Sequence, residues 1–388
     1  MSDDVVLRVT DLRKSFTVRS RGLLRRPIGE VKAVDGLSFE VGAQRTLGLV
    51  GESGCGKSTA GRTILRLLDP TGGTIELDGR DITHLSRREL LPVRRTAQMI
   101  FQDPYSSLNP RHTVGTIIGA PFTIQGVTPP GGVRTAVEEL MARVGLNPEH
   151  FNRYPAEFSG GQRQRIGIAR AIALRPRLIV CDEPVSALDV SIQAQVVNLL
   201  KDLQDEYGIA YVFIAHDLSV VRQISHRVAV MYLGHLVEIA DRDDLFARPQ
   251  HPYTHALLSA VPIPDPHAEA GRERILLRGD LPSPMSPPSG CVFHTRCFVA
   301  QDRCRTEVPA LREVGNGHVV ACHFPIDGIV PGSTSGHTVV GPDSGLTPQP
   351  APVVGVPSEL IADLGETSMD QLNPLDFTKP TGEDEPSN

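Results

Sequence analysis

The chain has 388 residues, enough for one large α/β domain and a smaller second unit. Its formal net charge of −6 gives no sign of nucleic-acid binding. The first residues lack the basic and apolar regions of a signal peptide, and no apolar run approaches the ~20 residues that span a bilayer, so we expect a cytosolic chain. The six cysteines should then be thiols or metal ligands rather than disulfides.

Near the N-terminus, two segments alternate apolar with polar residues and predict two strands of an antiparallel sheet, Val5 to Leu12 and Ala33 to Val41. A basic stretch, Arg19 to Pro27, separates them. Its charges fit either a solvated loop or a contact with lipid headgroups or a membrane partner.

The apolar run Thr46 to Val50 leads into a glycine-rich loop and a predicted helix, Lys57 to Leu68. The loop fits G-x-x-x-x-G-K-[ST], whose glycines let the backbone curl around phosphates at a positive helix N-terminus. We expect Lys57 to reach the β- and γ-phosphates of a nucleotide, Ser58 to bind Mg²⁺ and Thr59 to lie near the α-phosphate. The motif consists of Gly51, Glu52, Ser53, Gly54, Cys55, Gly56, Lys57, Ser58 and Thr59.

A second glycine-rich run precedes another predicted helix, which starts near Gln162. The run consists of Phe158, Ser159, Gly160, Gly161 and Gln162. Like the first loop, it forms a helix N-terminus that can bind an anion, although one nucleotide needs only one such cradle. We therefore expect this run to serve a nucleotide held by another subunit, with ATP between two chains.

Between the two runs, the pattern predicts strands at Thr74 to Leu77 and Ala97 to Gln102 and a helix at Arg134 to Val144. After them, Leu178 to Asp182 is apolar without alternation, as in a central parallel strand covered on both faces. Asp182 at its end is expected to hold Mg²⁺, and Glu183 to orient and deprotonate an attacking water.

The alternation of helices and strands then continues, with a strand that ends just before His216. The predicted segments are a helix Ile192 to Glu206, a strand Ile209 to Ala215, a helix Ser219 to Ile224 and a strand Val228 to Leu233. This order predicts an α/β fold with a doubly wound sheet and an added antiparallel edge.

These motifs, in this order, resemble those of the nucleotide-binding subunit of an ABC transporter over about Val5 to Val261. The resemblance assigns the first glycine-rich loop as Walker A, Gln102 as the Q-loop, Ser159 to Gln162 as the signature, Leu178 to Glu183 as Walker B, Ser186 to Asp189 as the D-loop and His216 as the switch histidine. It implies an ATPase in which Glu183 polarises water, His216 contacts the γ-phosphate, Gln102 links the metal site to the membrane partner and Asp189 belongs to the composite ATP site.

The same resemblance implies a P-loop NTPase of ABC type with an antiparallel β subdomain and a helical subdomain at about 103–176. Two residues depart from the usual pattern. The aromatic residue expected to stack on adenine is Phe16 where Tyr is common, and the signature begins with Phe158 rather than Leu. Neither contacts a phosphate, so both leave the expected ATP site intact. From Phe16 alone, a buried core residue is an equal alternative.

A finer resemblance comes from Phe101 to Pro110, Asp182 to Ser191 and His251 to Leu258, which are similar to the ATPases of dipeptide and oligopeptide importers. The insert before Ala33 resembles the second of the two ATPases that such importers carry. The implied partners are a second ATPase in a heterodimer, two membrane permeases and an extracytoplasmic substrate-binding protein, with this chain peripheral on the cytoplasmic face of the membrane. Nickel and glutathione importers share the pattern, whereas a soluble ABC protein of DNA repair or the ribosome would need a long coiled coil or a second cassette.

Four cysteines follow the ATPase segment, in a region that we place at 262–326 as a small Cys-rich appendage. They are Cys291, Cys297, Cys304 and Cys322. Four thiolates can hold zinc or an iron–sulfur cluster. The resemblance implies a four-iron four-sulfur cluster; zinc, with His294 or His323 as a replacement ligand, and free thiols are the alternatives. We expect Cys55 and Cys181 to be structural, and the acidic Pro- and Gly-rich stretch 327–388 to be disordered.

Overall fold

The computed structural model describes residues 4–20, 26–103, 105–261 and 274–326. All of them lie in the first of two compact units, 1–337, and the second unit, 338–388, lies outside the described residues. The predicted acidic tail therefore falls outside the described part of the chain, as do the centre of the basic loop and the start of the predicted appendage.

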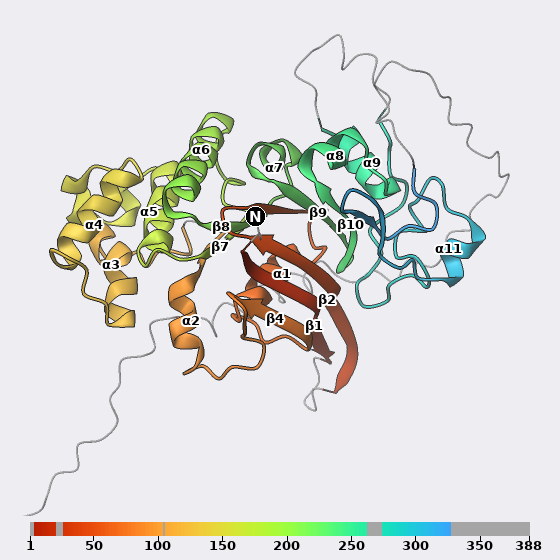
Figure 1. The fold of residues 1–388 in the computed structure, drawn as a ribbon, viewed down its shortest axis with the longest axis horizontal. Helices are drawn as coiled ribbons and strands as arrows, with labels where there is room; N and C mark the ends of the chain where they lie inside the picture. Colours follow the sequence, from red (N-terminus) through yellow and green to blue (C-terminus); the bar gives the residue numbers. More distant parts are fainter. Residues whose placement is uncertain (1–3, 21–25, 104, 262–273, 327–388) are drawn as a thin grey trace, which may run out of the picture. The chain divides into compact units, whose positions relative to one another are not determined.

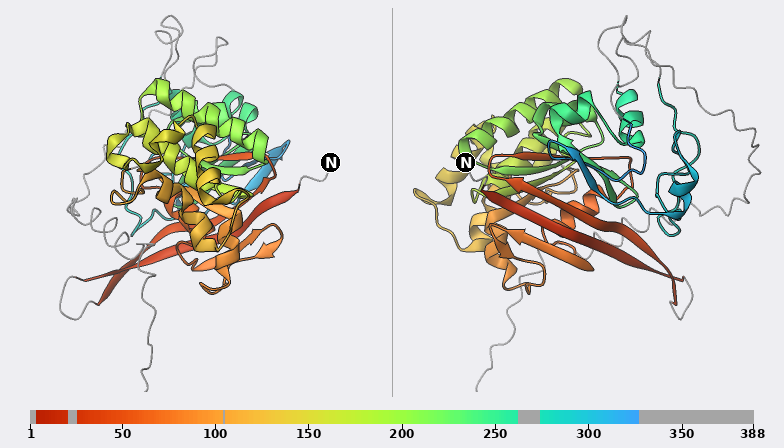
Figure 2. Two further views of the ribbon diagram at one scale, coloured as in Figure 1. Left: turned by 90° about the vertical axis from the view of Figure 1, so that its left-hand side faces the viewer. Right: turned by 45° about the vertical axis from the view of Figure 1, so that its right-hand side comes forward.

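A four-stranded antiparallel sheet has the order β2-β1-β4-β5. Its strands are β1 (Val5–Arg19), β2 (Pro27–Gly42), β4 (Gly72–Leu77) and β5 (Arg80–Asp81). Both arms of the β1–β2 hairpin run beyond their predicted ends, and Figure 2 shows them extending past the other strands. The extension has mostly exposed or half-buried side chains, so its pairing rests on backbone hydrogen bonds rather than on an apolar face.

The main sheet has eight strands in the order β11-β12-β10-β9-β3-β8-β7-β6. Its parallel part is β9 (Arg227–Tyr232), β3 (Thr46–Val50), β8 (Ala210–Ile214), β7 (Leu178–Asp182) and β6 (Ala97–Ile100). Its antiparallel edge is β10 (His235–Asp241), β12 (His318–Val320) and β11 (Arg312–Gly315). The predicted doubly wound sheet with an antiparallel edge is thus confirmed.

Both faces of the parallel strands are buried, as the unbroken apolar runs predict. In β7, Leu178 and Val180 pack in a core with β1, β2 and the helix α1 (Lys57–Ile64). Ile179 and Cys181 pack on the other side, in a core with several helices. These helices include α5 (Gly160–Ile172), α6 (Val190–Tyr207) and α7 (Leu218–Ile224).

A helical segment lies between β6 and β7, at the end of the molecule opposite α11 (Asp302–Thr306) in Figure 1. It contains α3 (Val114–Gln125), α4 (Gly132–Arg143), the 3₁₀ turns Pro148–Asn152 and Pro155–Glu157, and α5. The sequence pattern predicted α4 and α5 but not α3, which tolerates Pro121 in its interior. The remaining helices are α2 (Leu90–Thr96), α8 (Arg242–Ala247) and α9 (Pro252–Ser259).

The Cys-rich region differs from the predicted appendage, because its described part is built into the main body. Strand β12 pairs with β10, matching Val320 with Glu238. Phe293 is 1 % exposed and packs edge-on against Tyr232 in β9, with ring centroids 5.1 Å apart. Cys291 and Cys304 belong to the same core as the helices of the main sheet. Within residues 4–326, leaving aside the undescribed stretches, we find no helix that is both long and apolar enough to span a membrane.

Candidate active site

The phosphate-binding loop connects β3 to α1 and closes with Gly56, whose φ of 104° lies in the left-handed region. A Cβ at this position would come within 2.0 Å of the carbonyl oxygen of Ala33, so both the backbone angle and the space require glycine. In the described part of the chain no side chain caps the N-terminus of α1. Its first N–H groups therefore remain available to an anion.

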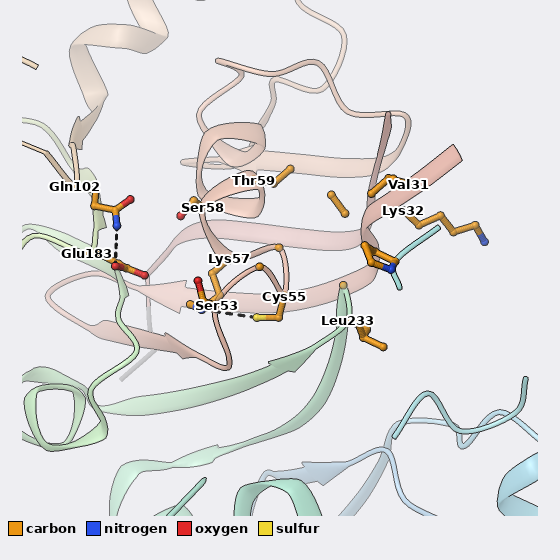
Figure 3. Close-up of a pocket in the computed structure, with 15 residues that line it drawn as sticks. Val31, Lys32, Ser53, Cys55, Lys57, Ser58, Thr59, Gln102, Glu183 and Leu233 are labelled. Carbon is orange, nitrogen blue, oxygen red and sulfur yellow. Dashed lines mark hydrogen bonds between the residues drawn. The ribbon is translucent and has the colours of Figure 1, made fainter. Parts of the chain in front are cut away.

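Lys57 lies inside this loop and is 4 % exposed. Its ammonium donates to the backbone oxygens of Gly51 at 2.8 Å and Glu52 at 2.9 Å. It also contacts the sulfur of Cys55 at 3.8 Å, as Figure 3 shows. The charge is thus held within the loop, where a bound phosphate chain can replace the carbonyl partners.

A carboxylate and a hydroxyl meet beside the loop. The hydroxyl of Ser58 donates to Oδ1 of Asp182 at 2.6 Å, and Asp182 is fully buried at the end of β7. Among the described residues, Oδ2 of Asp182 accepts no hydrogen bond, and its nearest cation is Arg62 at 3.7 Å. Burial raises the pKa of Asp182. An unsatisfied buried carboxylate beside a hydroxyl fits the oxygen ligands that Mg²⁺ prefers.

Three further residues, at the carboxyl ends of neighbouring parallel strands, converge on one another. The amide of Gln102, after β6, donates to Oε2 of Glu183 at 2.9 Å. Nδ1 of His216, after β8, lies 3.5 Å from the same oxygen. Glu183 itself has φ 45°, and its N–H donates to the carbonyl of Ile214 at 3.0 Å, which fixes its side chain at the sheet edge.

A cavity of about 220 Å³ is lined by the loop, Gln102 and Glu183. Asp182 and His216 do not line it but contact the lining residues Ser58 and Glu183. In Figure 3, Gln102 and Glu183 lie at one end and Val31, Lys32 and Leu233 at the other, with the loop between them. The lining consists of Val31, Lys32, Ala33, Ser53, Gly54, Cys55, Gly56, Lys57, Ser58, Thr59, Gln102, Glu183, Leu233, Gly234 and Pro284. A nucleotide with its terminal phosphate toward Glu183 would fill such an elongated site.

Phe16 is not part of this lining. It pairs with Val31 in the hairpin, and Val31 lines the cavity in its place. No local sequence signal predicts Val31 or Pro284 at the cavity, and Pro284 comes from the Cys-rich segment. Both reach the cavity through contacts between elements far apart in the chain.

The signature residues lie away from the cavity of their own chain. Ser159 accepts a hydrogen bond from the N–H of Gln162 at 3.3 Å, and Gln162 Oε1 accepts one from the N–H of Ser159 at 3.0 Å. Ser159, Gln162 and Asp189 are all exposed. Leu188 lies beneath the signature, 3.7 Å from a Cβ built on Gly160. Neither Gly160 nor Gly161 lines the cavity, so this chain alone does not bring the signature to its own loop.

The four C-terminal cysteines surround a second, small cavity. Cys291, Cys297, Cys304 and Cys322 all line it, together with His251, His294 and His323. Burial raises the pKa of Cys297 to about 12 and that of Cys322 to about 11, so the bare thiols stay protonated at neutral pH. In the described part of the chain, no three Cys, His, Asp or Glu side chains are grouped so that they could hold a metal ion.

The other two cysteines are buried, as predicted for structural residues. Cys181 is fully buried within β7, and burial raises its pKa. Cys55 is 1 % exposed and also lines the nucleotide cavity.

Comparisons with known proteins agree with this geometry. The family model described as "ABC transporter" matches residues 34–186, and the one described as "Oligopeptide/dipeptide transporter, C-terminal region" matches residues 237–304. A solved dimeric, post-hydrolysis structure of the ATP-binding cassette MJ0796 with ADP and Pi is 27 % identical with a TM-score of 0.54, covering 61 % of this chain and 98 % of that one.

Curated relatives extend the similarity to both regions. The oligopeptide transport ATP-binding protein AppF of Bacillus subtilis is 55 % identical over 83 % of this chain and 98 % of its own. YkfD of the same organism, a putative oligopeptide transport ATP-binding protein, is 58 % identical over 76 % of this chain and 90 % of its own. At this identity and coverage, the chain belongs to the ABC transporter ATP-binding proteins, in the family of the oligopeptide transport type.

Proposed function

We propose that this protein hydrolyses ATP to power the import of peptides through a membrane-embedded transporter. The observation that carries the proposal is the cavity lined by the loop around Lys57 together with Gln102 and Glu183. Asp182 lies behind Ser58 and His216 lies beside Glu183, each in contact with a lining residue. The peptide substrate rests on the named roles of AppF and YkfD.

In the proposed reaction, the loop N–H groups and Lys57 hold the β- and γ-phosphates. Glu183 orients a water molecule and accepts its proton as the water oxygen attacks the γ-phosphorus. The bond from that phosphorus to the β-phosphate oxygen then breaks, leaving ADP and phosphate. His216 contacts the γ-phosphate, and Gln102, whose amide donates to Glu183, reports the state of this site to the membrane partner.

Mg²⁺ would be held by Ser58, with Asp182 and Gln102 contributing. The fit rests on the buried Oδ2 of Asp182, which accepts no hydrogen bond from the described residues. When bound, the ion neutralises charge on the β- and γ-phosphate oxygens. Binding requires the charged form of Asp182, whose pKa burial raises, so Mg²⁺ affinity should fall as the pH is lowered.

The exposed signature is proposed to complete the ATP site of a second ATPase, which in turn supplies its signature to Lys57. Residues of the proposed contact are Ser159, Gly160, Gly161, Gln162 and Asp189. The isolated chain should therefore hydrolyse ATP slowly, and turnover should rise with the partner ATPase and the permeases. Ser159→Ala should leave the ATP affinity of the isolated chain unchanged while lowering turnover of the complex. Full activity in a proven monomer would exclude this arrangement.

The proposed assembly places the chain on the cytoplasmic face of a membrane as one half of an ATPase heterodimer. Two permeases and an extracytoplasmic binding protein complete it. The direct test is uptake of a labelled dipeptide by proteoliposomes that hold the whole complex. Transport should require ATP on the side of this chain and should stop with Lys57→Ala. Transport of another solute but no peptide would redirect the substrate assignment.

For the cysteine cavity we propose a four-iron four-sulfur cluster. Four cysteines line one cavity, while no three potential ligands in the described residues are grouped tightly enough for a single ion. A cluster binds each thiolate through a different iron and so accepts a wider set of sulfurs than zinc does. Protein purified without oxygen should be brown and contain about four irons. Stoichiometric zinc would instead support the alternative metal. If neither iron nor zinc is found, the four cysteines are thiols without a metal.

A further inference from the structure

An arginine of the Cys-rich segment reaches the phosphate-binding loop. Nη1 of Arg296 lies 2.7 Å from Oε2 of Glu52, the second residue of that loop, and their side chains are 10 % and 27 % exposed. At this low exposure the pair is only partly screened by solvent and salt. The contact joins residues that are 244 positions apart in the chain, and no sequence motif predicts it.

Residues packed near Arg296 also hold the main chain of Glu52. Its N–H donates to the hydroxyl oxygen of Tyr253 at 2.8 Å. Tyr253 is fully buried and packs against Phe293, with ring centroids 5.3 Å apart. The N–H of Arg296 in turn donates to the carbonyl of Phe293 at 3.0 Å. The side chain and the backbone of Glu52 are thus both held by residues that come after the last parallel strand, β9, in the chain.

The Arg296–Glu52 pair matters for ATP binding because Glu52 is negatively charged. ATP brings a highly negative phosphate chain to a loop whose own cation is Lys57, and Lys57 already donates to the backbone oxygen of Glu52. An unpaired carboxylate at this position would repel the ligand and compete for Lys57. Arg296 removes that charge and holds the side chain to one side.

Arg296 also belongs to the turns that carry the cysteines. The N–H of His294 donates to the carbonyl of Cys291 at 3.0 Å, and the N–H of Cys297 donates to that of His294 at 3.4 Å. Arg296 therefore lies in a short run of consecutive turns with a cavity-lining cysteine at each end. The turn that positions Arg296 is thus continuous with two residues that line the cysteine cavity.

We propose that Arg296 is a positioning residue for ATP binding, which holds and neutralises Glu52 and thereby couples the cysteine cavity to the phosphate-binding loop. The coupling half rests on the proposed function of the cavity, whereas the Arg296–Glu52 half does not. Because coupling between sites is reciprocal, ATP must in turn favour the cavity state that favours ATP.

The first test measures the dissociation constant of a ribose-labelled fluorescent ATP on the full chain, purified without oxygen. Arg296→Gln should weaken binding about tenfold, within the range typical of coupled sites, and Arg296→Lys should recover part of the loss. The matched control is Arg303→Gln, which breaks a 2.7 Å pair with Glu307 in the same segment but on its exposed surface, and should change nothing.

Rescue separates positioning from general damage. Adding Glu52→Gln to Arg296→Gln removes the unpaired carboxylate and should return the affinity to within about threefold of the wild type. Melting curves of all variants show whether each is folded. Unchanged affinity in Arg296→Gln, or a double variant as weak as the single one, overturns the role of Arg296.

The second test addresses the coupling. Cys297→Ser should weaken ATP binding in the wild-type background and have no effect when Arg296→Gln and Glu52→Gln are present. An equal effect in both backgrounds, or none in the wild type, overturns the coupling. Iron and zinc are assayed on the same samples, so a failed cluster assignment is recognised by its own measurement.

Discussion

The nucleotide cavity and the Cys-rich segment are built in opposite ways. In the cavity, Gln102, Glu183 and His216 each follow one of three neighbouring parallel strands, β6, β7 and β8, so their meeting is a property of the sheet. The Cys-rich segment has only short elements and depends on separate anchors. The site of chemistry is therefore specified by local patterns, whereas the segment is specified by distant contacts.

Several anchors of the segment can be named, among them the Arg296–Glu52 pair. Phe293 packs among Tyr232, Tyr253 and His251, and β12 matches two residues of β10. Burying one phenylalanine contributes about 2–3 kcal/mol, a small sum for a segment with little core of its own. Substitutions in the nucleotide cavity should therefore impair catalysis, whereas substitutions in the Cys-rich segment should lower its local stability.

The largest expected effect is on chemistry alone. Glu183→Gln should keep ATP binding but lower turnover by roughly 10² to 10⁴, because it removes a positioned general base. Turnover is measured in the assembled complex with the partner site disabled. The Cys-rich segment should be untouched, as judged by its hydrogen exchange. Near-normal turnover would remove Glu183 from this role.

The next effect is on binding. Lys57→Ala should weaken ATP binding by about 10²-fold, because it deletes the buried cation that the loop holds for the phosphate chain. Titration with the fluorescent nucleotide checks this. Unchanged affinity would contradict the assignment of the loop.

Sequence patterns predicted which residues meet at the candidate site because the geometry of the site is local. A loop between a strand and a helix, or a residue one step beyond a strand, has the same surroundings in any parallel sheet. Val31, Pro284 and Arg296 could not be predicted, because each reaches the site across the fold. The pairing of the Cys-rich segment with the main sheet could not be predicted for the same reason: β12 spans three residues, too few for a periodic signal, and its partner β10 lies about 80 residues earlier.

We expect acid to destabilise the region around His251, which packs against Phe293 of the Cys-rich segment. Burial lowers the pKa of His251 to about 4, against 6.5 for the ordinary side chain, despite the opposing charge of Glu238, while His255 adds to the lowering. The unfolded chain therefore binds the proton more readily than the folded one, and stability present above pH 6.5 is lost as the pH falls toward 4. Between pH 7.5 and 5 the loss should be about 2 kcal/mol.

Melting curves across that pH range, with hydrogen exchange to locate the opening, test this prediction. His251 accepts the N–H of Tyr253 at 3.1 Å as the N-cap of α9. His251→Asn keeps an acceptor at this cap but cannot titrate, so it should flatten the acid dependence. An equally steep loss in this variant would assign the acid sensitivity to other groups.

The smallest effect concerns the end of the cavity near Val31, where we expect the nucleoside. Phe16 lies close to this end because its strand pairs with that of Val31, but Phe16 does not line the cavity. Phe16 stands opposite Val31 across the hairpin, and Lys14 lies over its ring at 4.9 Å. A bound adenine that extends past Val31 would meet the Phe16 ring, and stacking of this kind contributes about 0.5–1.5 kcal/mol. Phe16→Ala should then weaken ATP about three- to tenfold, Phe16→Tyr should bind normally, and ribose triphosphate without a base should not distinguish them. If Phe16→Ala binds as the wild type does while Val31→Ala binds weakly, the base is held by the wall of the cavity, and the aromatic residue only supports the hairpin.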